Sequence, residues 1–492
     1  MAIIKTNPRI VLGSILLAMF MAAIEGTIVA TAIPSIVADL GGFSLFSWVF
    51  SSFLLAQAVT IPIYGKLADL YGRKPIFTFG VLVFLAGSVL CGFAQTMNML
   101  ILFRLIQGLG AGAVQPIAMT IVGDIFTMKN RARVQGYISI VWGVSSILGP
   151  GLGAFFVQYV KWSWIFWMNI PFGVLTLAGV WFFLEETIPK QDHKIDYIGS
   201  VLIFISISAI MIVFIQAGTV WAWYSSPVLL LLGVFLAGTY LFVLQEKRAA
   251  EPIMPLEIWT DPLIMVANLA TLTTGVVLIG VASFLPTYIQ GVMGESPIIA
   301  GFALSFMSVG WTIGATMAGK VMLKYGFRRL AIVGGGWILI GSIFFITLRP
   351  ERGWLWAGMG TLLIGFGMGL SRTIFILGIQ NSVKWERRGV ATASNMFMNI
   401  LGNAMGAAVL GGILNSTLTR YLQGVSGETL NIDVINALLD PVKRGLLPQG
   451  VVQIMSSGLA VAMLYVFWGL FSLAVLSFIL IMFFPADRRD AT

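Results

Sequence analysis

GKLADLYGRK, at residues 65–74, recurs in altered form as GKVMLKYGFR at residues 319–328. The opening Gly-Lys and the later Tyr-Gly of the first stretch are identical in the second, 254 residues further along the chain. LIQGLGAG at 105–112 and LLIGFGMG at 362–369 have nearly the same separation. Two matches at one long spacing indicate duplicated halves. Duplicated halves are typical of transporters, which place the substrate at the interface between the repeats.

The composition indicates a polytopic membrane protein. Of 492 residues, 58% are hydrophobic and only 10% are charged, whereas soluble domains carry about 25% charged residues. So few charged residues cannot cover the surface of a soluble chain this long. A soluble enzyme, a disordered chain and a fibre are therefore excluded. The single cysteine, Cys91, and the single histidine, His193, leave no intramolecular disulfide and no His-rich metal site, so we expect no bound metal.

The number of membrane spans follows from the apolar runs. A transmembrane helix needs about 20 mostly apolar residues, and fourteen runs meet this requirement. They lie at 11–33, 47–64, 75–94, 99–123, 137–159, 165–184, 197–217, 227–245, 262–285, 298–318, 330–347, 354–379, 390–414 and 457–484. The longest loop, at about 415–456, contains NIDVINALL (431–439), which predicts a short amphipathic helix on the outer surface.

The positive residues predict the orientation. The net charge is +9, and 21 of the 29 lysines and arginines lie in the N-terminus, the even-numbered loops and the C-terminus. The odd-numbered loops hold only 6. Because positive loops stay in the cytoplasm, we expect a multi-pass protein of the cell membrane with both termini cytoplasmic. The charge is spread over short segments rather than gathered on one face, which argues against nucleic acid as a partner.

These patterns together predict an all-α polytopic membrane protein with fourteen transmembrane helices. Two six-helix pseudo-repeat bundles, at residues 1–190 and 256–492, flank two inserted transmembrane helices at 191–255. GATMAGKV (314–321) is one residue short of a phosphate-binding loop, because Val321 stands where Ser or Thr is needed. We therefore expect no nucleotide cofactor, and energy from an ion gradient or from the substrate's own gradient.

Glu25 is the only acid well inside a predicted span, and Arg104 and Arg372 are the two basic residues inside spans. A charge at the bilayer centre costs roughly 2.5–3.5 kcal/mol. A carboxyl avoids much of this cost by taking up a proton, whereas a guanidinium keeps its charge. Arg104 therefore needs a wet cavity, backbone carbonyls or an acid, and Glu25 is the strongest candidate for its partner.

The residues alone leave other interpretations open. Glu25 could be a permanently protonated residue that bonds between helices, and Arg104 a structural clamp. Arg372 either lines the cavity or extends to the cytoplasmic membrane surface. Several other polar residues lie inside spans, where substrate contact and hydrogen bonding between helices are equally compatible with the sequence. They are Gln57, Gln107, Gln216, Asn395, Asn399 and Asn403.

The motifs resemble those of the major facilitator superfamily and, over essentially the whole chain, its fourteen-helix drug:proton antiporter family. The loop after the second span, with Gly65, Asp69, Gly72, Arg73 and Lys74, reproduces the superfamily signature. RLIQGLGAGA (104–113) resembles the fourth-helix motif, and GPGLGA (149–154) the antiporter motif of the fifth helix. AIEGTIVATAIPSI (23–36) resembles the first-helix signature with Glu where Asp is usual, and WSWIFWMNIPFG (162–173) the entry to helix six.

The resemblance implies the major facilitator fold, alternating access and roles for named residues. It implies that Arg104 biases Glu25 toward the deprotonated form until substrate or conformation separates them. It implies a cytoplasmic latch in which Asp69 caps a neighbouring helix and pairs with Arg131 or Arg133. In the second repeat Leu323 replaces this Asp, so only the N-terminal half is expected to latch strongly. The full expected sets are Gly65, Asp69, Gly72, Arg73, Arg131 and Arg133 for the latch, and Gly143, Gly149, Pro150 and Gly153 for the antiporter motif.

The expected function is therefore a proton-coupled antiporter, not an enzyme, that exports lipophilic and often cationic drugs from the cytoplasm by alternating access and so confers antibiotic resistance. Glu25 is the expected protonation and substrate-coupling site. Its partners are such small molecules, protons and membrane lipid; we expect a monomer with Gln57, Gln107, Gln216, Arg372, Asn395 and Asn399 as cavity candidates. The alternatives are a narrower proton antiporter for one metabolite, lipid or siderophore, a substrate:proton importer, and a non-transporting membrane sensor. A sensor would not need Glu25 to titrate.

Overall fold

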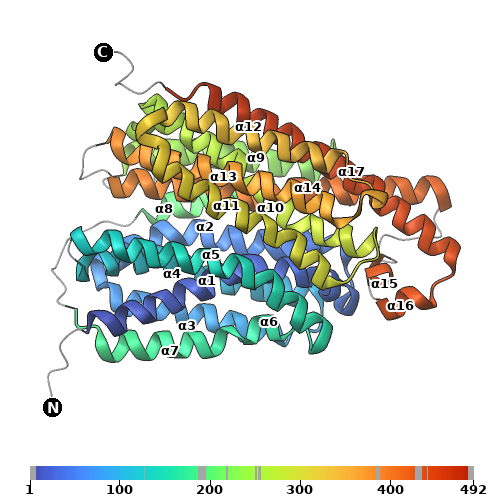
Figure 1. Ribbon diagram of the computed structural model, residues 1–492, viewed down its shortest axis with the longest axis horizontal. Coiled ribbons are helices and arrows are strands. Elements are labelled where there is room, and N and C mark those ends of the chain that lie inside the picture. Colours follow the sequence, from blue (N-terminus) through green and yellow to red (C-terminus); the bar gives the residue numbers. More distant parts are fainter. Residues whose placement is uncertain are drawn as a thin grey trace.

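The protein is an all-helical bundle that crosses a membrane fourteen times by the length and composition of its helices (Figure 1). The computed structural model describes residues 7–126, 128–186, 196–217, 220–249, 252, 256–383, 388–426, 435–439 and 441–485. No β-strand occurs among these residues. The predicted number of spans and the predicted fold class are confirmed.

The helices of the first half and the inserted pair follow the predicted spans in order. They are α1 (Pro8–Leu40), η1 (Phe43–Leu45), α2 (Phe46–Tyr71), α3 (Arg73–Gly92), α4 (Met97–Ile125), α5 (Met128–Tyr159), α6 (Trp164–Trp167), α7 (Asn169–Phe183), α8 (Tyr197–Gln216) and α9 (Ser226–Arg248). The sixth span is broken between α6 and α7. Pro171 has no N–H to donate to the carbonyl of Trp167, one turn earlier, and the break at Met168 falls in this turn.

The second half repeats this order. Its elements are η2 (Leu256–Thr260), α10 (Pro262–Gly291), α11 (Pro297–Tyr325), α12 (Phe327–Ile346), η3 (Pro350–Arg352), α13 (Gly353–Ser382), α14 (Arg388–Ser426), α15 (Ile435–Leu439), α16 (Pro441–Leu446) and α17 (Gln449–Met482). Helix α14 continues twelve residues beyond the predicted end of its span at 414. Hydropathy falls at Asn415 because polar residues follow, but the backbone hydrogen bonds of a helix continue past the apolar segment.

The internal repeat is visible in the backbone. Gly72 between α2 and α3 has φ +95°, and Gly326 between α11 and α12 has φ +78°. Residues with a side chain rarely adopt this left-handed conformation, whereas glycine adopts it freely. The same sharp connection therefore occurs at the same place in both halves, as the matching sequences at 65–74 and 319–328 predict.

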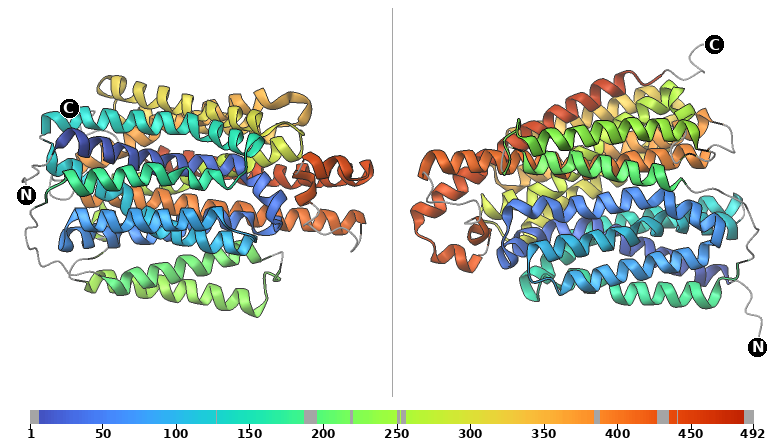
Figure 2. Two further views of the ribbon diagram at one scale, coloured as in Figure 1. Left: turned by 90° about the horizontal axis from the view of Figure 1, so that it is seen from below. Right: turned by 180° about the vertical axis from the view of Figure 1, so that it is seen from behind.

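The two halves lie side by side and contact each other through paired helices, α1 with α10, α2 with α14, and α5 with α11 (Figure 1). The inserted helices α8 and α9 pack mainly on each other, and α8 also contacts α2 and α14. Figure 2 shows this inserted pair at the edge of the bundle.

The two halves contact each other at the end of the bundle away from the termini, called here the far end. There the Phe46 and Phe284 rings lie edge to face, with centroids 5.4 Å apart. Gln290 Nε2 also donates to Thr31 O at 3.4 Å, from one half to the other. One continuous apolar cluster includes residues of both halves at this end. This structure is therefore closed at the far end.

A strap formed by α15 and α16 crosses the far end (Figure 1). Lys443 Nζ donates to Ala38 O in the last turn of α1 at 2.8 Å, and Arg444 Nη1 donates to Gln290 O in the last turn of α10 at 3.2 Å. Asn436 Oδ1 accepts from the Phe43 N–H at 3.2 Å. Cations at helix C-termini are favourable because the last carbonyls carry partial negative charge. The strap therefore links one helix of each half. Of the predicted 431–439 helix, residues 431–434 lie outside the described residues.

Candidate functional site

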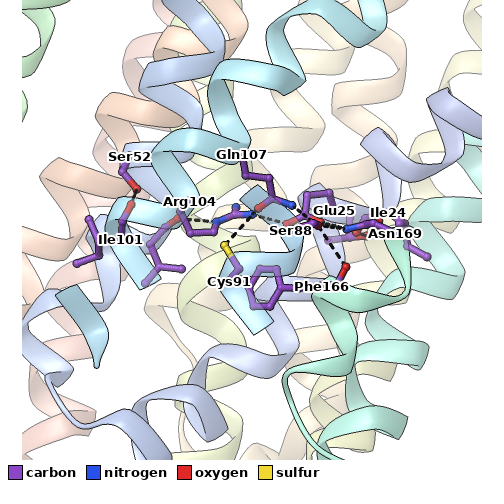
Figure 3. Close-up of polar contacts among 12 residues, drawn as sticks. Ile24, Glu25, Ser52, Ser88, Cys91, Ile101, Arg104, Gln107, Phe166 and Asn169 are labelled. Carbon is purple, nitrogen blue, oxygen red and sulfur yellow. Dashed lines mark hydrogen bonds and ion pairs between the residues drawn. The ribbon is translucent and has the colours of Figure 1, made fainter. Parts of the chain in front are cut away.

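Glu25 and Arg104 form an ion pair inside the N-terminal half (Figure 3). Glu25 lies midway along α1 and Arg104 in the third turn of α4, and their residues are 1% and 2% exposed. Arg104 Nη1 donates directly to Glu25 Oε1. The contact that the sequence predicts between these residues is therefore present; its role in proton coupling stays a prediction.

Arg104 has several further partners, so its charge is well compensated. Its Nε donates to Val49 O of α2 at 3.1 Å, and Nη1 also donates to Gln107 Oε1 at 2.6 Å. Its guanidinium carbon lies 4.1 Å from the centre of the Phe53 ring, which adds a cation–π contact. Guanidinium hydrogen bonds to carbonyl and carboxylate oxygens are the interactions that make a buried arginine tolerable.

The other oxygen of the Glu25 carboxylate is held by a residue of α7. Asn169 Nδ2 donates to Glu25 Oε2 at 2.8 Å and to Ser88 Oγ of α3 at 2.9 Å. Gln107 Nε2 donates to the same Ser88 hydroxyl at 2.9 Å. The sequence analysis did not select Asn169 or Ser88. The signal that could have found Asn169 is its position beside the break at Met168, where a polar side chain enters the bundle interior.

This arrangement is a sealed ionisable pair rather than an open pocket. The carboxylate of Glu25 accepts from charged Arg104 and from Asn169, and breaking such a buried pair typically costs about 3–5 kcal/mol. A proton that binds to Glu25 removes its charge and leaves the guanidinium of Arg104 without its acid. Substrate cannot contact Glu25 in this conformation because its side chain is fully buried. The pair therefore links α1 to α4 in the interior of the N-terminal half.

The glycines of the antiporter motif let α5 approach α1 and α11 closely. A Cβ at Gly149 would overlap Thr27 Oγ1, and one at Gly153 would lie 2.7 Å from Ile28 O, so both positions pack on α1 just after Glu25. On the other side, a Cβ at Gly301 of α11 would lie 2.8 Å from Pro150 O. Helix α5 therefore contacts both the helix that carries Glu25 and the opposite half. A Cβ at Gly143 would lie 3.7 Å from Thr312 Oγ1 of the same helix α11.

A charge cluster lies at the end of the bundle that carries the termini. Arg73 Nε lies 2.8 Å from Asp124 Oδ2 of α4, and Glu186 accepts from the Arg73 and Lys74 N–H groups at 2.6 and 2.9 Å. Glu186 thus caps the N-terminus of α3, where acidic groups are favourable. The sequence analysis missed Asp124 and Glu186, since neither belongs to the loop motif.

The remaining latch residues are only partly described. Gly72 forms the sharp turn before α3, and a Cβ at Gly65 would meet no atom within 4 Å. The side chains of Asp69, Arg131 and Arg133 lie outside the described residues, so their expected pairing stays a prediction.

The predicted cavity residues lie in different surroundings. Gln107 is fully buried in the Glu25 network, and Gln216 is the last residue of the inserted helix α8, not midway along a span. Asn395 Nδ2 donates to Asn268 Oδ1 at 3.0 Å and to Thr271 Oγ1 at 2.9 Å, so it bonds between α14 and α10.

The other three cavity candidates are partly accessible. Gln57 and Asn399 are half-buried as residues. The Nδ2 atom of Asn399 is buried, and it has no hydrogen-bond partner among the described residues. Arg372 of α13 is also half-buried, and its guanidinium carbon lies 5.8 Å from the centre of the Trp311 ring of α11.

The repeated halves, the fourteen spans and the intramembrane ion pair define a membrane transporter rather than an enzyme. The Major Facilitator Superfamily profile matches residues 15–407. The chain belongs to this superfamily.

Two relatives carry the names of multidrug transporters. The chain is 34% identical to Multidrug resistance protein 3 of Bacillus subtilis (strain 168), over 99% of this chain and 97% of that protein. It is 31% identical to Multidrug transporter protein MdtP of the same organism, over 90% of this chain and 84% of that protein.

Solved structures share the fold at low sequence identity. A bacterial homolog of the human lysosomal transporter Spinster, in an inward-facing and unoccupied conformation, gives a TM-score of 0.66 at 17% identity, covering 96% of this chain and 97% of that one. A D-xylose–proton symporter gives 0.60 at 11% identity, covering 92% and 99%. The expected major facilitator fold is confirmed.

Proposed function

We propose that the protein is a proton-coupled antiporter of the cell membrane that exports lipophilic, often cationic compounds from the cytoplasm. The observation that carries this proposal is the buried Glu25–Arg104 pair, an ionisable carboxylate inside a transmembrane bundle. Ionisable residues at this depth are costly and commonly mark proton relays. The named multidrug relatives support drugs as the substrate class.

The distribution of positive charge supports cytoplasmic termini. With that orientation the closed far end faces outward. An antiporter in this state has released its proton inside and is ready to bind drug. An intact ion pair, with Glu25 charged, is the arrangement that this step requires. Protonation from outside, in the opposite conformation, would separate Glu25 from Arg104 and favour drug release.

Coupling between the substrate path and Glu25 runs through helix contacts, since substrate does not reach the carboxylate directly. Movement of the second half displaces α5 through the contact of Pro150 with Gly301. Helix α5 in turn packs on α1 at Thr27, two residues after Glu25. Rocking of the halves therefore changes the position of α1 relative to α4, and with it the stability of the ion pair.

The test uses the full chain in proteoliposomes with an imposed pH gradient and tetraphenylphosphonium as the lipophilic cation. We expect gradient-driven accumulation by the unaltered protein and none by Glu25→Gln. Glu351→Gln is the matched control, because Glu351 is an exposed acid at the far end. Accumulation by Glu25→Gln at the unaltered rate would refute the coupling role. A panel that also contains neutral lipophiles and single metabolites separates a multidrug exporter from a narrow antiporter.

A further inference from the structure

Arg372 is the second arginine within the spans, and its surroundings contrast with those of Arg104. Arg104 is paired with an acid and bonded to two further oxygens. In the part of the chain that the structure describes, no group accepts a hydrogen bond from Arg372 and no acid pairs with it. Its guanidinium lies over one aromatic ring there, that of Trp311. The Arg372 residue is half-buried, so part of its surface remains accessible.

The guanidinium lies deep in the bundle and does not extend to the membrane surface. Trp311 is the middle residue of α11, which runs from Pro297 to Tyr325, so it lies about 21 Å from either end at 1.5 Å per residue. The guanidinium carbon of Arg372 lies 5.8 Å from the centre of this ring. Side chains of a helix also point toward its N-terminus, which for α13 is the far end, so Arg372 extends away from the end that carries the termini. Of the two alternatives that the sequence leaves open, the structure favours the interior.

Both side chains face the inside of the bundle. On α11 the exposed apolar residues Val309 and Ile313 mark the outer face. Trp311 lies two residues from each, about 200° around the helix. On α13 the exposed residue Met359 marks the outer face, and Arg372 lies about 140° around the helix from it. The accessible surface of the pair is therefore interior surface, beside the helix α11 that contacts α5 of the opposite half.

We infer that Arg372 and Trp311 form a subsite for the carboxylate of an aromatic organic acid or zwitterion on the substrate path. A guanidinium that has no acid of its own can give two parallel N–H bonds to a carboxylate. Trp311 adds a surface for an aromatic substrate body. This inference rests on the proposed function, since it takes the interior between the halves as the substrate path.

The test compares two probes of nearly one shape that differ in charge, radiolabelled 1-naphthoate and neutral 1-naphthamide. Binding to the detergent-solubilised full chain is measured by scintillation proximity at pH 7. We expect naphthoate to bind about tenfold to a hundredfold more tightly than naphthamide, the range for hydrogen bonds to a charged group. Arg372→Gln should abolish this preference, and Arg372→Lys should retain only part of it because the bidentate geometry is lost. Trp311→Leu should weaken both probes alike.

Arg352→Gln is the matched control. Arg352 also lies over a tryptophan, 4.6 Å from the Trp356 ring centre, but at the exposed far end, so its loss should leave the preference intact. Equal affinity of the two probes for the unaltered protein, or a preference that survives in Arg372→Gln, would overturn the inference. If Arg372→Gln does not fold, as judged by size-exclusion elution, an undiminished preference in Arg372→Lys overturns it instead.

Two further arms separate the alternatives. If short-chain phosphatidylglycerol displaces naphthoate and a second aromatic acid does not, Arg372 holds a lipid headgroup and the substrate assignment is wrong. The proposed function can fail separately. If the protein prefers naphthoate but does not move tetraphenylphosphonium in response to a pH gradient, the subsite stands and the proposed export function is wrong. Gradient-driven export without the preference gives the reverse result.

Discussion

Replacing Glu25 with glutamine tests the buried ion pair most directly. Glutamine has nearly the same shape but no charge, so Arg104 keeps neutral partners such as Val49 O and Gln107 Oε1 and loses the acid that balances its charge. Removing one member of a buried pair leaves the other uncompensated, which costs about 3–5 kcal/mol of folding free energy. We therefore expect Glu25→Gln to lower the thermal stability of the folded protein as well as to abolish coupling.

The hydrogen bonds around Glu25 give a reason why the protein cannot easily relax. If the glutamine oxygen faces Arg104, its NH2 group faces Asn169 Nδ2, and two donors oppose each other. Turning the Asn169 amide would let its unpartnered Oδ1 accept from the glutamine. That turn would lose the bond from Asn169 Nδ2 to Ser88 Oγ, at 2.9 Å. An unsatisfied buried donor costs about 1–3 kcal/mol in either arrangement.

A double-mutant cycle with Arg104→Met measures the interaction by tryptophan fluorescence during thermal unfolding in detergent. Both single variants should melt lower than the unaltered protein. Glu25→Gln/Arg104→Met should melt no lower than the worse single variant, because neither charge remains unpaired. The Arg104→Met deficit should shrink as the pH falls, since the carboxylate left alone can take up a proton. The Glu25→Gln deficit should not, because the guanidinium has no proton to lose at these pH values.

Two results would contradict this reasoning. Unaltered melting of Glu25→Gln would show that Arg104 finds full compensation without the acid. Strict additivity of the two single effects in the double variant would show that the residues do not interact energetically.

Three further changes test other contacts of the structure. Gly149→Ala should lower the free energy of unfolding by about 1–3 kcal/mol and slow export, because its Cβ would overlap Thr27 Oγ1. Gly151→Ala in the same motif is the control and should be neutral, since no atom lies within 4 Å of its Cβ. Equal export rates of the two variants would contradict the close packing of α5 on α1. Glu186→Ala should lower the free energy of unfolding by about 0.5–2 kcal/mol. It should also speed hydrogen exchange of the Arg73 and Lys74 amides, which Glu186 caps. Unchanged exchange rates would show that Glu186 does not cap α3. Lys443→Gln with Arg444→Gln should open the far end, so that an impermeant maleimide labels Ser47→Cys about threefold to thirtyfold faster in a Cys91→Ser background. The control is Lys161→Gln, a change at an exposed lysine. An unchanged labelling rate would show that the strap does not hold the far end closed.

The structure changes the interpretation of several residues that the sequence analysis selected for polarity alone. Gln107 was a cavity candidate, yet it is fully buried and bonded to Arg104. Asn395 was also a cavity candidate, and its side chain forms a hydrogen bond between α14 and α10. A polar residue inside a span either faces substrate or bonds to another helix, and hydropathy is the same in both cases. Only the position of the neighbouring helices distinguishes the two.

The sequence by itself determined the class of protein, the number of spans and the duplicated halves. These properties depend on local quantities: apolar length, the placement of lysine and arginine, and the repeated turn that places glycine at 72 and 326 with positive φ. It also identified Glu25 and Arg104, since charges inside an apolar run are visible without coordinates.

The contacts were decided by the tertiary structure. Asn169 and Ser88, from α7 and α3, complete the Glu25 site, and Trp311 of α11 meets Arg372 of α13. Such partners lie tens of residues apart, and which of them meet depends on the rotation of each helix about its axis, which here is set by packing between helices.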